Sequence, residues 1–96
     1  MITSKQRAFL RSLANPSEPI FQIGKGGVSD ESIRVIGDAL EARELVKIRT
    51  LETSPLSSRE AAGLVSERTG ADIVSVVGRN FVLYRRSVNK PKIVLP

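Results

Sequence analysis

Apolar residues recur along the chain with two spacings, one typical of helices and one typical of strands, and they divide it into seven elements. Serine or threonine at the start of a helical pattern marks a helix N-terminus, most clearly when Gln or Glu follows three residues later. The predicted helices follow N-caps at Thr3, Ser29 and Ser57. The predicted strands lie at residues 20–23, 45–51, 73–77 and 81–85.

The same patterns predict which side chains are buried. In the first two helices the apolar stripes are Phe9, Leu10 and Leu13, and Ile33, Ile36 and Leu40. In the strands the inward positions are Val46 and Ile48, with Phe81 and Tyr84 also in the core. The acids of the second helical pattern, Asp38, Glu41 and Glu44, fall on its polar side, and we expect them to face water.

The element order α-β-α-β-α-β-β predicts one compact α/β domain over residues 1–86, with a mixed four-stranded sheet. Right-handed crossovers would place the second and third helices on one face of this sheet. Gly78, Arg79 and Asn80 suit the tight turn of a hairpin between the last two strands. The pattern leaves open the strand order and the face on which the first helix packs. Residues 87–96, with two prolines and two lysines, predict a loosely ordered basic tail.

Charge and composition narrow the function. Fifteen Lys and Arg against ten Asp and Glu give a net charge of +5, which is more typical of a nucleic-acid binder than of a protein with acidic partners. The chain has no cysteine and no histidine, so the commonest metal ligands and general base are missing. We therefore expect no enzymatic activity, no metal and no cofactor. No signal peptide or membrane span is visible, and we expect a cytoplasmic protein.

Gly24, Lys25, Gly26 and Gly27 lie between a predicted strand and a predicted helix. Glycine tolerates unusual backbone angles and has no Cβ, so such a loop can bring its N–H groups close to a phosphate, with Lys25 beside it. A turn that uses glycine only for its geometry is the alternative. Nucleotide binding is disfavoured, because the Gly-Lys-Ser/Thr ending of a phosphate-binding loop is absent.

Basic residues flank this loop in the sequence. The acidic second helix is a poor surface for a polyanion, whereas the first helix and the last hairpin are good ones. The candidate contacts there are Lys5, Arg7, Arg11, Arg79 and Arg85. Solvated helix charges, or charges that protect an edge strand from aggregation, are the alternatives for these residues.

Three separated motifs resemble the single-domain bacterial YhbY proteins of the CRM family, named for chloroplast RNA splicing and ribosome maturation. They are residues 5–14, 22–27 and 77–85. The resemblance implies an RNA-binding domain whose G-x-x-G loop contacts RNA, and bacterial members that associate with precursors of the large ribosomal subunit. It also implies a fold similar to the C-terminal domain of translation initiation factor three. KH domains use a G-x-x-G loop too, but between two helices.

The charge pattern and the glycine loop predict a nucleic-acid binder, and the resemblance implies an RNA-binding protein that contacts ribosomal RNA, on pre-ribosomal particles, during assembly of the large subunit. Loop amides and Lys25 would hold the RNA backbone, and the basic residues would widen the contact. A DNA-binding or nucleoid-associated protein that uses the same basic face is the alternative. An RNA-modifying enzyme ranks third, because no base of the usual kind is present.

Overall fold

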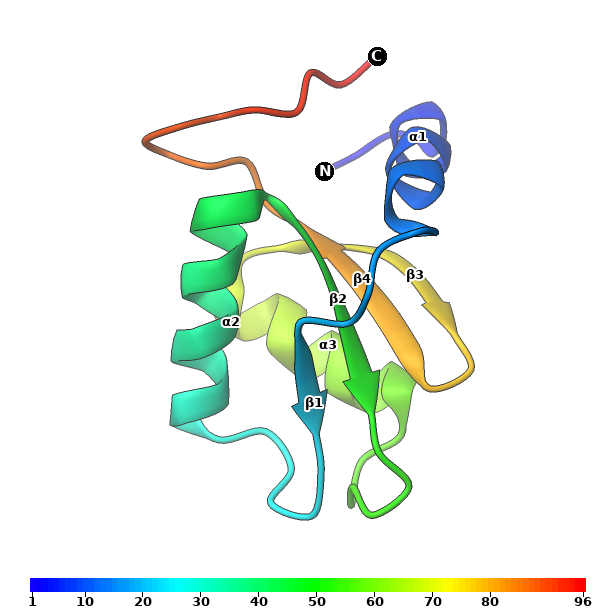
Figure 1. The fold of residues 1–96 in the computed structure, drawn as a ribbon, viewed down its shortest axis with the longest axis vertical. Coiled ribbons are helices and arrows are strands. Elements are labelled where there is room, and N and C mark those ends of the chain that lie inside the picture. Colours follow the sequence, from blue (N-terminus) through cyan, green and yellow to red (C-terminus); the bar gives the residue numbers. More distant parts are fainter.

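Three helices and four strands follow one another in the predicted order in the computed structural model, which describes residues 1–96 (Figure 1). The helices are α1 (Ser4–Ala14), α2 (Asp30–Arg43) and α3 (Ser58–Thr69). The strands are β1 (Phe21–Ile23), β2 (Leu45–Thr50), β3 (Asp72–Val77) and β4 (Asn80–Tyr84). None of the helices is long and apolar enough to cross a membrane.

The predicted N-caps begin all three helices. Thr3, Ser29 and Ser57 each accept a hydrogen bond from the backbone N–H three residues later. The partner side chain at that third position returns a bond to the N-cap backbone, which completes a capping box in each helix. Helix α3 ends at Gly70, whose φ of 74° lies in the left-handed region that glycine adopts without strain. The N-caps predicted at Thr3, Ser29 and Ser57 are thus confirmed.

The sheet has the strand order β1-β2-β4-β3, which the sequence pattern left open. Strands β1 and β2 are parallel, and β4 pairs antiparallel with both β2 and β3. The predicted hairpin is confirmed, but Val77 and Asn80 are paired, so Asn80 belongs to β4 and the turn consists of Gly78 and Arg79 alone, with Gly78 at a φ of 59°. Because β1, β2 and β3 run the same way, their carboxyl ends lie at one end of the sheet.

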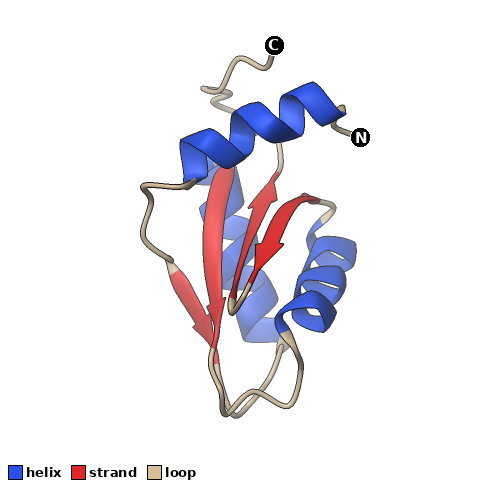
Figure 2. Ribbon diagram, turned by 90° about the vertical axis from the view of Figure 1, so that its right-hand side faces the viewer, coloured by secondary structure: helices blue, strands red, loops and turns tan.

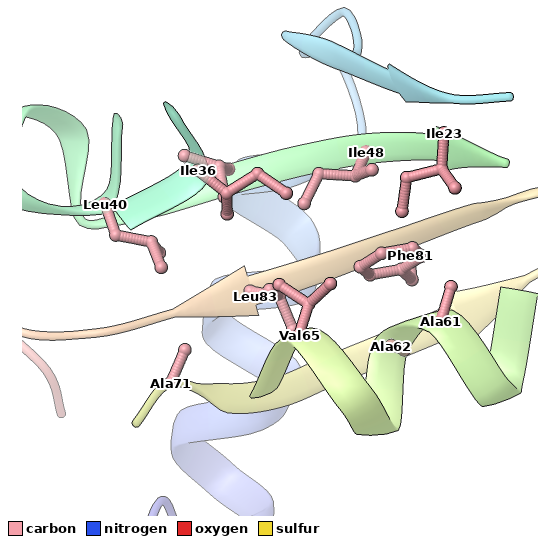
Figure 3. Packing of buried hydrophobic residues seen from close by; sticks show 11 residues of the cluster. Ile23, Ile36, Leu40, Ile48, Ala61, Ala62, Val65, Ala71, Phe81 and Leu83 are labelled. Atoms are coloured by element: carbon pink, nitrogen blue, oxygen red, sulfur yellow. The ribbon is translucent and has the colours of Figure 1, made fainter. Parts of the chain in front are cut away.

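The two faces of the sheet are covered differently. Helices α2 and α3 cover one face, where Ile36, Val65 and Phe81 belong to the main core (Figure 3). Helix α1 crosses one end of the other face and buries Leu10 against a second cluster that contains Val82 (Figure 2). The prediction for α2 and α3 is confirmed, and the structure now places α1.

Two expected positions were wrong. Leu13 is 41% exposed, because Leu10 and Ala14 form the centre of the buried side of α1 and Leu13 lies at its margin. Glu44 was expected to face water but is fully buried. It follows the last turn of α2 with a φ of 69°, a left-handed value that is uncommon for glutamate. This conformation accompanies a side chain that turns away from the helix surface and into the fold.

The Glu44 carboxylate holds the C-terminal segment. It accepts hydrogen bonds from the backbone N–H groups of Ser87 (2.8 Å), Lys92 (2.7 Å) and Ile93 (2.7 Å). Burial acts to raise the pKa of Glu44, but these three N–H groups outweigh it and leave the pKa below its ordinary value. The buried carboxylate is thus satisfied as an anion.

Glu41 adds a second attachment for the same segment. Its carboxylate accepts from the Ser87 hydroxyl (2.6 Å) and from the N–H groups of Val88 and Asn89 (both 3.1 Å). The hydroxyl bond first, and the two N–H bonds next, lower the pKa of Glu41 to about 2. Residues 87–96 form no helix or strand, and their separation from the domain at residue 86 stays a prediction.

Replacing Glu44 by Gln tests this attachment. One glutamine oxygen cannot serve three donors, and its NH₂ group would face them, so we expect the free energy of unfolding in urea to fall by about 1–3 kcal/mol. Amide exchange at Ser87, Lys92 and Ile93 should accelerate. Glu67→Gln is the control, because Glu67 is exposed on α3. Unchanged amide exchange in Glu44→Gln would contradict this account.

The attachment should also depend on pH. Since the pKa values of Glu41 and Glu44 are both lowered, the C-terminal segment of the parent should loosen as the pH falls from about 4.5 toward 2.

Candidate nucleic-acid interface

The glycine-rich loop lies at the end of the sheet where β1 finishes, at the bottom of Figure 1. The N–H of Gly27 donates to the carbonyl of Gly24 (2.9 Å), which closes a turn with Lys25 and Gly26 at its centre. Both central residues are exposed, and the Lys25 ammonium has no partner within the protein. The turn therefore presents a free cation and its backbone to solvent.

The three glycines of this turn are not equivalent. A Cβ on Gly24 would lie 3.3 Å from Leu51 Cδ1, and one on Gly27 would lie 3.3 Å from Pro55 Cγ. Gly27 also has a φ of 66°. Gly26, in contrast, has no positive φ and open space where a Cβ would be. Packing against the loop after β2 explains Gly24 and Gly27, but it requires neither Gly26 nor Lys25.

The acids that follow the loop are largely paired. Glu31 lies 2.8 Å from the guanidinium of Arg34, and Asp30 lies 2.9 Å from that of Arg68. The Glu31 carboxylate raises the pKa of Arg34, first through its hydrogen bond and then through its charge. The free N–H groups at the start of α2 are partly used by the Ser29–Ser32 capping box. An anion would therefore meet the turn itself rather than the first turn of the helix.

Arg79 lies at the same end of the sheet as the turn. The N–H of Thr50 donates to the Arg79 carbonyl (2.6 Å), and the N–H of Leu51 donates to the Ile23 carbonyl (2.8 Å). These two bonds align the end of β1, the end of β2 and the hairpin tip. Neighbouring strands are about 4.8 Å apart, so the tip lies about 10 Å from the end of β1. The Arg79 guanidinium is 3.6 Å from Glu52 in an exposed pair, which is a weak interaction.

The other predicted contacts lie toward the opposite end of the sheet, on α1 and after β4. Arg7 donates to the backbone carbonyls of Ile73 and Val74 on the edge strand β3. Arg85 donates to the carbonyls of Thr69 (2.8 Å) and Gly37 (3.0 Å), and so links α3 to α2. Both guanidinium groups thus have an internal structural role. Lys5 and Arg11 are exposed and have no partner in the protein.

Arg49 is a basic residue near the loop that the sequence pattern did not select. Its alternation with Val46 and Ile48 already predicted an outward side chain, but the importance of this position depends on the strand order. In the sheet, Arg49 pairs with Gln22, two residues before Gly24, and with Asn80, next to Arg79. It therefore lies between the turn and the hairpin tip.

The chemistry available at this end of the sheet is that of anion binding. It offers the free Lys25 ammonium, the exposed turn and two arginines. No group of three or more His, Cys, Asp or Glu residues that could hold a metal ion is present in the structure. A cavity of about 650 Å³ lies away from the turn, beneath the C-terminal segment between Tyr84 and Ile93.

Several known proteins are similar to this chain in sequence, and one solved structure is also similar in fold. A chain of Bacillus subtilis (strain 168), described as the probable RNA-binding protein YqeI, is 42% identical over 96 residues, which cover both chains completely. An RNA-binding protein of Haemophilus influenzae is 30% identical over 95 residues, 99% of this chain and 95% of that one. The solution structure of the hypothetical protein SAV1595 from Staphylococcus aureus matches with a TM-score of 0.83 and 45% identity over the whole of both chains.

The family model of the CRS1 / YhbY (CRM) domain matches residues 2–85. This range includes all seven helices and strands, the glycine turn and the hairpin tip. The chain therefore belongs to the CRS1 / YhbY (CRM) domain family.

Proposed function

We propose that this protein binds RNA by holding phosphates at the Gly24–Gly27 turn, and that it acts on ribosomal RNA during assembly of the large ribosomal subunit. The observation that supports the binding site best is the contrast within the turn. The fold accounts for Gly24 and Gly27 but gives no reason for Lys25 or Gly26. The relatives described as RNA-binding proteins support RNA as the ligand.

Backbone recognition suits the geometry. The Lys25 ammonium is a point charge on a flexible stem, and Gly26 has no Cβ to stand between the exposed backbone of the turn and a phosphate oxygen. Arg79, about 10 Å from the end of β1, is within reach of another phosphate of the same strand. Lys5 and Arg11, exposed on α1, extend the positive surface. Arg7 and Arg85 support it from inside the fold, through the backbone carbonyls that they bind.

Assembly of the large ribosomal subunit is the finer part of the proposal. It rests on the resemblance to the bacterial YhbY proteins, whose members associate with precursors of that subunit. The electrostatic argument alone would also fit DNA, because both polymers offer phosphates. The cellular experiment below separates these two ligands.

Changing Lys25 and Gly26 together to Asp tests the turn. Attraction becomes repulsion at two positions, and each lost charge-assisted contact is worth about 1.5–3 kcal/mol, so RNA affinity should fall at least tenfold. For the parent, log K should fall with log salt with a slope of about −2 to −4. The variant should have a shallower slope, and its melting temperature should stay close to that of the parent. A folded variant that binds RNA like the parent would mean that the turn has only a structural use.

Single alanines separate the two uses of glycine within the turn. Gly27→Ala should lower the free energy of unfolding by about 1–2 kcal/mol, since its φ is positive and its Cβ would crowd Pro55. Gly26→Ala should leave stability within about 0.5 kcal/mol of the parent. Both are measured by thermal unfolding. Equal losses for the two variants would contradict the geometry described for the turn.

Sucrose-gradient fractionation of cell extract tests the cellular role. We expect the protein to travel with precursors of the large subunit and to be scarce on translating ribosomes. The variant with Asp at positions 25 and 26 should move to the top of the gradient, because its contact with RNA is weakened. A uniform distribution over ribosomal fractions would indicate a permanent ribosomal component. Recovery with the nucleoid would favour DNA as the ligand.

A further inference from the structure

A row of four side chains crosses the sheet beside the glycine turn. The strand register pairs Gln22 with Arg49, Arg49 with Asn80, and Asn80 with Val77. We call these four residues the cross-strand row. Since side chains alternate along a strand and the adjacent Ile23, Ile48, Phe81 and Val76 pack toward α2 and α3, the row points to the opposite face.

Helix α1 does not cover this part of the sheet. It crosses the far end of the face, and in Figure 2 no helix lies in front of the strand ends near the hairpin tip. Gln22 and Arg49 are exposed, and Val77 is 70% exposed. The row is therefore open to a partner along most of its length.

The polar groups of the row have no partners within the protein. Gln22 and Arg49 make no side-chain hydrogen bond or ion pair in the structure, and no acidic residue belongs to the row. Asn80 is half-buried and its Oδ1 atom has no hydrogen-bond partner. Because this oxygen is itself buried, the polar groups of the row that a ligand can reach are the Arg49 guanidinium and the Gln22 carboxamide.

Position connects the row to the turn. Gln22 is two residues before Gly24, and Asn80 follows Arg79, so the row spans the space between the two proposed phosphate contacts.

On α1, Arg11 is one helical turn after Arg7, which faces β3. Gln6 and Phe9, in contrast, face the C-terminal segment or the cluster that it joins. Arg11 is thus on the side of α1 away from that segment.

We infer that the cross-strand row contacts the bases of an unpaired RNA segment whose phosphates are held at the turn, an inference that rests on the proposed function. Guanidinium and carboxamide groups are those that hydrogen-bond to base edges, and a guanidinium plane also stacks on a base. In an RNA duplex the Watson–Crick edges are engaged in pairing, and the major-groove edges lie in a deep, narrow groove that side chains do not reach.

The length of the row limits how many bases it contacts. Four strands at about 4.8 Å spacing give a row about 14 Å long, which is enough for about two bases. None of the four residues of the row is aromatic, and the aromatic side chains of Phe81 and Tyr84, on the same strand as Asn80, are buried. The contact is therefore a short polar one rather than an extended stacking platform, and we expect a preference among bases at one or two positions.

The experiment compares RNA affinities of the parent and of a double variant, Gln22→Ala with Arg49→Ala. The probes are oligo-A, oligo-C and oligo-U of about 12 nucleotides, and a blunt-ended RNA duplex with the same number of phosphates. Arg43→Ala is the matched control for a lost charge, since Arg43 is exposed at the far end of α2 and has no partner. Arg49→Lys keeps the charge but loses the planar fork.

We expect the parent to bind unpaired RNA more tightly than the duplex and to discriminate among the three oligomers by about tenfold. The double variant and Arg49→Lys should lose most of this discrimination. Their affinity for the duplex should match that of Arg43→Ala, and their salt slope should match that of the parent.

Three results would overturn the inference while leaving the proposed function intact. One is a parent that binds all RNAs equally. Another is a double variant with a uniform loss on every RNA and a salt slope smaller by about one, which would make Arg49 a phosphate contact. The third is a double variant that behaves like the parent, which would leave the row to a protein partner. Failure of the parent to bind any of the RNAs would overturn the proposed function itself.

Discussion

The parallel pairing of β1 with β2 is the constraint on which the site depends. Strand β1 has only three residues, too few to hold a position by themselves. The chain here is held by the bond from Ile20 N–H to the Lys47 carbonyl at one end and by the bond from Leu51 N–H to the Ile23 carbonyl at the other. Burial of Ile23 in the main core anchors the middle. Because the strands are parallel, the turn that leaves β1 meets the loop that leaves β2, and Gly24 and Gly27 are selected by that contact.

Much of this fold could be predicted because its signals are local. A capping box is complete within four residues, and the two-residue turn at Gly78 and Arg79 needs only those residues and their strands. The glycine turn was predicted as a candidate site for the same reason. Local signals do not report which strands become neighbours. The position of Arg49 between Gln22 and Asn80 therefore had no counterpart in the sequence pattern.

Glu44 and Arg85 illustrate a second limit. Helical periodicity assigned Glu44 to the solvent side, yet its partners are backbone N–H groups more than forty residues away. Charge clustering assigned Arg85 to a contact surface, yet it reaches the carbonyls that end α3 and lie within α2. Every residue carries the same backbone groups, so the sequence does not show which N–H or carbonyl groups need a side-chain partner. From the sequence alone, a charged side chain that binds such groups cannot be told from one that faces water. In this protein an acidic side chain, Glu44, and a basic one, Arg85, both bind backbone groups within the fold.

This internal use of charge changes the estimate of where a polyanion meets the protein. Glu41 and Glu44 accept from N–H donors, and Arg7 and Arg85 donate to carbonyls, so the charged groups of all four make hydrogen bonds within the fold. The net charge of +5 is therefore a poor guide to the binding face. Lys25 and Arg49, two exposed cations without a partner that flank the glycine turn, give a better one. They lie on either side of the end of β1, one in a turn suited to phosphate and one in a row suited to base edges. A single RNA strand can meet both contacts only if its bases are free to turn toward the sheet. That requirement favours unpaired RNA over duplex RNA and over duplex DNA.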